Sequence, residues 1–73
     1  MVGMKKDSES MAMGKKLKGL RTETGLSQDK LGEILGITGA AWRQYELGLR
    51  TPIDKIKKRI AVHFEKTVDE LFF

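Results

Sequence analysis

LSQDKLGEILGITGAAWRQYELG, residues 26–48, is the stretch that decides the fold of this chain. Ser27 and Thr38 carry side chains that suit helix N-caps, and each precedes a run of helix-compatible residues. Gly36 and Gly48 end these runs, because glycine takes a left-handed backbone without the steric cost of a Cβ atom. The pattern therefore predicts two short helices joined by a tight glycine turn. The two helices are expected over residues 28–35 and 39 to about 47.

The first of these helices places Leu31 and Leu35 on one face, at a spacing of four residues. Gly32 lies between them, although glycine inside a helix costs roughly 1 kcal/mol relative to alanine. Close approach of another helix is the expected reason for this glycine. Asp29 in the first turn suits the positive end of the helix dipole.

The second helix has two distinct faces. At 100° per residue, Ala41, Trp42 and Tyr45 share one side and are expected in the core. For Trp42 the alternative is an exposed stacking role, and the core position is favoured. Arg43 and Gln44 lie on the outward side, and such side chains form paired hydrogen bonds with guanine and adenine edges. Small residues complete the N-terminal end of this side: Gly39 and Ala40.

Apolar stripes outside residues 26–48 predict three more helices and no strand. They are expected at about 11–24, at about 53–64 with Ile53, Ile56, Ile60 and Phe64 as its stripe, and at 67–73 with Thr67 as its cap. Residues 1–10 show no periodicity and are interpreted as a flexible N-terminal arm before a single domain of residues 11–73. A frayed terminus is favoured over a DNA-reaching arm, because the two acidic residues of the arm offset its two lysines. The prediction is an all-α, compact five-helix bundle.

Composition limits the classes of function. The net charge is +4 and the isoelectric point is near 9.6, which favours a polyanionic partner, although ordinary surface charge would look the same. There is no cysteine, which is typical of the cytoplasm, and no run of about 18 apolar residues that could span a membrane. His63 is the only histidine, and no nucleophile motif, phosphate-binding loop or metal-ligand spacing accompanies it. We therefore expect no enzyme activity, no cofactor and no small-molecule ligand.

Three segments in order resemble the phage repressor/Cro-type, or Xre-like, helix-turn-helix regulators. MGKKLKGLRTETGLSQDKLGEILGIT (13–38) is similar to the first two helices of that family and its turn. YELGLRTP (45–52) is similar to the end of its third helix and the following loop, and TVDELFF (67–73) to its closing helix. The resemblance implies the lambda-repressor-like fold, in which helices 2 and 3 form the helix-turn-helix. It also implies a bacterial or phage-encoded protein located in the cytoplasm on DNA.

The resemblance implies roles at matching positions. Base contacts would come from Gly39, Ala40, Arg43 and Gln44. Phosphate contacts would come from Gln28, Arg50 and Thr51, to which the sequence adds the caps Ser27 and Thr38 and the lysines Lys15 and Lys16. For these two lysines a solvated face is the equal alternative, and for Lys18 the solvated face is favoured. Arg21 and Glu46 match a structural salt bridge between the first and third helices. The family often has polar residues where this chain has Gly39, Ala40 and Ala41.

We therefore expect a sequence-specific regulator of transcription, a repressor that binds double-stranded DNA as a homodimer on a palindromic operator. Phe72 and Phe73 are predicted to form the dimer surface, the alternative being that Phe72 closes the core. A second hypothesis is a protein-interaction module or antitoxin of the same fold with weak DNA binding. The short side chains of Gly39 and Ala40 favour that second hypothesis.

Overall fold

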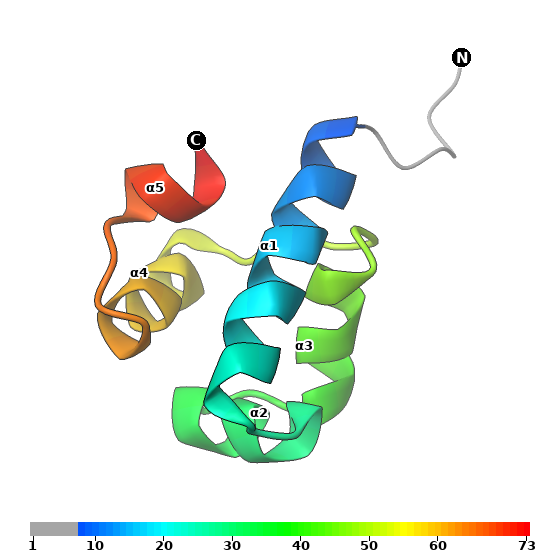
Figure 1. Cartoon of the computed structure of the whole chain (residues 1–73), viewed down its shortest axis with the longest axis vertical. Helices are drawn as coiled ribbons and strands as arrows, with labels where there is room; N and C mark the ends of the chain where they lie inside the picture. Colours follow the sequence, from blue (N-terminus) through cyan, green and yellow to red (C-terminus); the bar gives the residue numbers. More distant parts are fainter. Residues whose placement is uncertain (1–7) are drawn as a thin grey trace.

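The structure, a computed structural model, describes residues 8–73 and contains five α-helices and no strand in that part of the chain (Figure 1). They are α1 (Ser8–Thr24), α2 (Gln28–Leu35), α3 (Gly39–Glu46), α4 (Asp54–His63) and α5 (Val68–Phe72). Helix α1 contacts α3 and α5, α2 contacts α3 and α4, and α4 contacts α5. In Figure 1, α1 stands between α3 on one side and the pair α4 and α5 on the other. The predicted all-helical bundle of five helices is confirmed.

The predicted helix caps are present. The hydroxyl oxygen of Ser27 accepts a hydrogen bond from the backbone N–H three residues later at 3.0 Å, and that of Thr38 does the same at 2.9 Å. Thr67 and Glu70 form a complete capping box at the start of α5. Each cap satisfies an N–H that has no partner within its own helix, so the beginnings of α2, α3 and α5 are set locally.

The turn between α2 and α3 depends on two glycines. Gly36 has φ 78°, the left-handed conformation that ends α2. A Cβ atom on Gly32 would lie 2.8 Å from the carbonyl carbon of Thr38 and 2.9 Å from the nitrogen of Gly39. The start of α3 therefore packs directly on the α2 backbone, which confirms the close approach expected from the sequence.

The core is assembled from all five helices around Trp42, which is fully buried. The Trp42 ring meets Tyr45 edge-on at 6.1 Å between centroids and Phe64 at 6.5 Å. The exposed stacking role considered for Trp42 is therefore wrong. The buried hydrophobic residues are Met13, Leu17, Leu31, Leu35, Trp42, Tyr45, Ile56, Ile60, Ala61 and Leu71.

The structure corrects several boundaries and facings. Helix α1 begins at Ser8, so residues 8–10 are helical and not part of the predicted arm, while residues 1–7 lie outside the described residues. Ile53 is the N-cap of α4 and is 66% exposed, so the buried stripe of that helix starts one turn later. Ala41 is half-buried instead of buried. Lys57, which lies off the apolar stripe of α4, is half-buried and lies over Phe72 with its ammonium 5.5 Å from the ring centroid.

Candidate nucleic-acid interface

The carboxylate of Glu46 joins the first three helices. Arg21 of α1 donates to it through Nε at 2.6 Å and through Nη2 at 3.3 Å. Gln28, the first residue of α2, donates through Nε2 at 3.0 Å, and the indole nitrogen of Trp42 donates from one turn earlier in α3. Arg21 also donates to the carbonyl of Leu26 at 2.8 Å. The salt bridge predicted between Arg21 and Glu46 is present, and it is one part of a larger cluster.

The Glu46 side chain is only 4% exposed, yet its surroundings favour the ionised form. Burial by itself raises the pKa of this carboxyl, but the hydrogen bonds from Arg21, Gln28 and Trp42 outweigh burial and hold the pKa below its usual value. The carboxylate is therefore charged at neutral pH. Its three donors fix the orientation of α3 relative to α1 and α2.

The outward face of α3 carries the polar groups that the sequence predicted there. Arg43 is exposed and Gln44 is half-buried. Gln44 is tied to the following loop, because its side-chain oxygen accepts from Arg50 at 3.4 Å and its backbone carbonyl accepts from Leu49 at 2.9 Å. The structure thus brings Gln44 and Arg50 together beside the end of α3.

Lysines of α1 lie on the same side as Arg43. A hollow of about 480 Å³ is lined by Lys15, Lys18, Arg21, Gln28, Arg43, Glu46 and Leu47. Arg21 is already paired with Glu46, whereas Lys15, Lys18 and Arg43 have no carboxylate within ion-pair distance among residues 8–73. Three unpaired cations from α1 and α3 therefore surround the start of α2. Lys18 is exposed, in agreement with the solvated face favoured from the sequence, and it also lines this hollow.

Lys16 and Thr51, which were predicted as phosphate contacts, lie outside this group. The ammonium of Lys16 donates to the backbone carbonyl of Glu70 in α5 at 2.7 Å. Thr51 lines a separate hollow with Lys57 and Phe72, away from the α1–α3 hollow. Lys15 and Lys16 are 100° apart on α1, so only Lys15 turns towards α3.

Asp29 of α2 packs against Gly39, the first residue of α3. A Cβ atom on Gly39 would collide with the carboxylate oxygen Oδ1 of Asp29 and would lie 2.9 Å from the Asp29 Cα atom. The direction in which residue 39 would carry a side chain therefore faces α2 and not the outward side of α3. Ala40 is exposed and remains on the outward face. Sequence reasoning missed Asp29 here, because its position opposite Gly39 depends on the crossing of two helices.

The two capping residues keep their exposed positions at the helix starts. The oxygens of Ser27 and Thr38 accept the cap hydrogen bonds, and each hydroxyl retains a hydrogen to donate.

Of the two residues predicted to form the dimer surface, Phe72 packs against the core, which was the alternative prediction for it. Phe73 is 86% exposed, with Lys57 5.2 Å from its ring centroid.

Comparisons with protein-family models, curated proteins and solved structures return no match. Within residues 8–73, no helix has the length and apolar character needed to cross a bilayer. The same residues contain no group of three or more His, Cys, Asp or Glu side chains placed to hold a metal ion. Function is therefore inferred from the geometry of the described residues.

Proposed function

We propose that this protein is a sequence-specific regulator of transcription that binds double-stranded DNA, with α2 and α3 as a helix-turn-helix of the lambda-repressor type. The observation that carries the proposal is the group of unpaired cations Lys15, Lys18 and Arg43 around Gln28, on the same side as the outward face of α3. A cationic surface beside a capped, rigidly held helix matches the needs of major-groove binding. The resemblance of the sequence to Xre-like regulators supports the same function.

In the proposed complex α3 lies in the major groove. Arg43 binds a guanine edge through two hydrogen bonds, and the Gln44 amide hydrogen-bonds to an adjacent base. Gln28 donates one amide hydrogen to Glu46 and has a second hydrogen for a phosphate. Lys15, Lys18 and Arg50 contact phosphates on either side of α3, and they supply affinity without sequence preference.

A homodimer on a palindromic operator is part of the proposal. One helix of eight residues contacts only a few base pairs, and two-fold pairing doubles these contacts and sets the half-site spacing. Phe73 is the exposed aromatic residue that could join two copies, whereas Phe72 is engaged with the core of its own chain. Binding to an operator would repress transcription by occupying the promoter.

Selection of bound duplexes from a random pool tests the proposal directly. A regulator should enrich one sequence in two inverted half-sites, and its affinity should fall steeply with salt. Lys66→Ala is a control for the loss of net positive charge, because Lys66 is exposed between α4 and α5, on the other side of α1 from α3 (Figure 1). This variant should select the same DNA sequence as the wild type. Enrichment of no sequence, together with equal binding to random duplexes, would show that the proposed specificity is wrong.

A protein-interaction module of the same fold is the second candidate, and one observation favours it. The tip of α3 offers Gly39 and Ala40, and the nearest charged group is the carboxylate of Asp29, which repels phosphate. A protein that binds DNA only weakly would tolerate this arrangement. The salt titration distinguishes the two candidates, because such a module should show weak binding to duplex DNA at physiological salt.

A further inference from the structure

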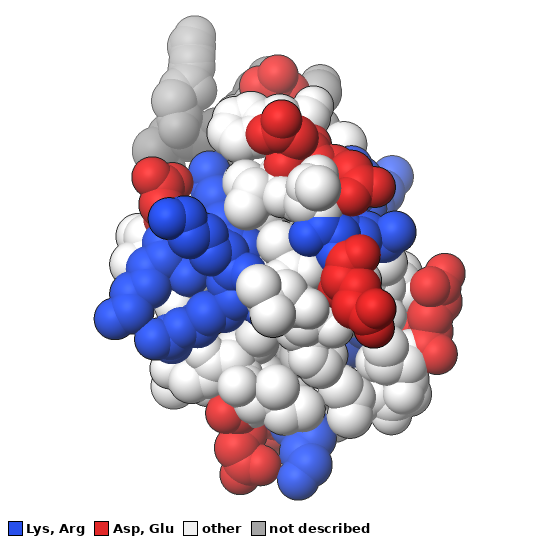
Figure 2. All heavy atoms as spheres, turned by 90° about the vertical axis from the view of Figure 1, so that its left-hand side faces the viewer, with Lys and Arg blue, Asp and Glu red and all other residues white. Residues whose placement is uncertain are grey.

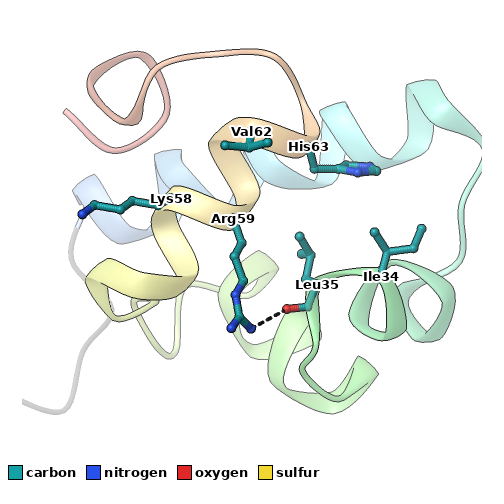
Figure 3. Close-up of a pocket in the computed structure, with 6 residues that line it drawn as sticks. All are labelled: Ile34, Leu35, Lys58, Arg59, Val62 and His63. Atoms are coloured by element: carbon teal, nitrogen blue, oxygen red, sulfur yellow. Dashed lines mark hydrogen bonds between the residues drawn. The ribbon is translucent and has the colours of Figure 1, made fainter.

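A groove between α2 and α4 has no role in the proposed DNA complex. It has a volume of about 420 Å³ and is lined by Ile34, Leu35, Lys58, Arg59, Val62 and His63 (Figure 3). None of these residues lines the hollow of Lys15, Lys18 and Arg43. Figure 3 shows the side chains of Ile34 and Leu35 from α2 and of Val62 and His63 from α4 around the same space.

Two aliphatic side chains that line the groove are exposed to solvent. Val62 is 77% exposed and Ile34 is 50% exposed, although both are β-branched aliphatic residues. They lie on two different helices and face the same opening. An apolar opening shared by two helices, beside charged groups, has room to bury an apolar side chain of a partner and to pair with its charges.

One side of the groove is strongly cationic. Lys58 and Arg59 are both exposed, and neither has a carboxylate within ion-pair distance in the described part of the chain. Arg59 is held in place, because its Nη1 donates to the carbonyl of Leu35 at 3.0 Å (Figure 3). Figure 2, which faces the side of α4 and α5, shows Lys and Arg side chains gathered beside an uncharged strip.

The combination of exposed aliphatic side chains with two cations distinguishes among possible occupants of the groove. A second copy of the chain seated by two-fold symmetry would place Lys58 and Arg59 against the same cations of its partner, and like charges across an interface are unfavourable. A DNA backbone would pair with the cations but would cover Val62 and Ile34 with charged phosphate. A peptide that carries carboxylates and one large apolar side chain satisfies both halves of the groove.

We propose that the α2–α4 groove binds an acidic peptide segment of a partner protein. An apolar side chain of the peptide lies between Ile34 and Val62, and its carboxylates pair with Lys58 and Arg59. The groove and the hollow of Lys15, Lys18 and Arg43 share no lining residue, so a peptide in the groove leaves that hollow uncovered. The proposal goes beyond DNA binding and does not depend on it.

Peptide display on the whole purified protein tests this site. Random peptides are selected on the wild type, and the enriched peptides are synthesised with a fluorescent label for anisotropy titrations. The expected peptides are rich in Asp and Glu and contain a large apolar residue. Their affinity should fall by at least about tenfold in Val62→Asp and in Lys58→Glu, which place negative charge beside the peptide carboxylates.

Two variants of the same helix region serve as matched controls. Ile53→Asp changes another exposed aliphatic residue to the same acid, and Lys55→Glu reverses another exposed lysine of α4, yet neither residue lines the groove. Both should bind the peptides as the wild type does. All four variants change exposed side chains, and circular dichroism checks that each is folded.

Four results would overturn the proposal. Selected peptides without acidic enrichment, or equal affinity for Val62→Asp and for the wild type, would show that the groove is not the binding site. Loss of duplex binding in Lys58→Glu with no peptide selected would assign these cations to DNA. Conversion of a dimer to a monomer by Val62→Asp, measured by light scattering, would assign the groove to a second copy.

Discussion

The indole N–H of Trp42 donates a hydrogen bond to the carboxylate of Glu46, one turn further along α3. The largest residue of the core thus has its polar atom matched to a buried charge. The same carboxylate accepts from Arg21 of α1 and Gln28 of α2. One side chain therefore couples the packing of the core to the orientation of the helix that we propose enters DNA.

Trp42→Phe should lower the free energy of unfolding by about 2–4 kcal/mol, because it removes a hydrogen bond to a charged group and leaves a small cavity. Urea denaturation followed by far-ultraviolet circular dichroism measures the change. Tyr45→Phe is the control, since it removes a hydroxyl from the neighbouring ring without removing the Glu46 contact, and it should cost under about 0.5 kcal/mol. Equal losses in the two variants would mean that the Trp42–Glu46 hydrogen bond contributes nothing.

Acid should destabilise the protein through Glu46. Because its folded pKa lies below the unfolded value, its ionised form stabilises the fold above the usual pKa of a glutamate, near 4.5, and this stabilisation is lost as pH falls through the folded pKa. Glu46→Gln should cost about 3 kcal/mol at neutral pH, because Arg21 loses its partner. Denaturation midpoints of both proteins between neutral pH and about pH 3 should converge as pH falls. A constant difference across this range would contradict the assignment.

Arg43→Ala should weaken binding to the selected operator by about 1–3 kcal/mol and relax the preference at one base pair of each half-site. The reason is that the exposed guanidinium on α3 is proposed to bind a guanine edge. Repeating the duplex selection with the variant measures both effects. An equal loss of affinity for the operator and for random DNA would instead assign Arg43 to a phosphate.

Lys18→Ala and Lys16→Ala should differ, although the two lysines are two residues apart on α1. Lys18 lines the hollow with Arg43, so its loss should weaken all duplexes about equally and reduce the salt slope by about one. Lys16 donates to Glu70 on the side of α5, so its loss should leave DNA affinity nearly unchanged. Titrations of duplex DNA at several salt concentrations compare the two variants. Equal effects would mean that α1 does not lie on DNA in the proposed orientation.

Asp29→Asn should strengthen duplex binding about two- to fivefold, equivalent to the ~0.5–1 kcal/mol typical of exposed charge interactions. The change removes a negative charge at the tip of α3 and keeps the shape that packs against Gly39. Asp69→Asn in α5 is the matched control, since it changes the net charge equally. A gain of the same size in the control would indicate a general charge effect and not a local one.

Local sequence signals predicted the helices well. The caps at Ser27, Thr38 and Thr67 and the left-handed Gly36 depend on contacts within a few residues, so single residue types are sufficient to reveal them. Helical periodicity likewise predicted that Trp42 would be buried. Ile53 was placed wrongly, because the same periodicity extends to the residue before the start of α4, where Ile53 is the N-cap.

The candidate interface was predictable only in part. Arg43 and Gln44 were found because their facing follows from a single helix. The hydrogen bond from Lys16 to Glu70 and the position of Lys18 beside Arg43 were not predicted, because they depend on which helix packs beside each face of α1. The position of Asp29 against Gly39 required the crossing of α2 and α3.

The sequence by itself therefore determined the number of helices, the capped starts of α2, α3 and α5 and which face of α3 turns outward, since these follow from short-range sterics and hydrogen bonds. Only the tertiary structure decided which charges gather at the start of α2 and which residues meet at Glu46. Most of those relationships join side chains of different helices, such as Gln28 of α2 and Glu46 of α3, and they depend on the packing of whole helices.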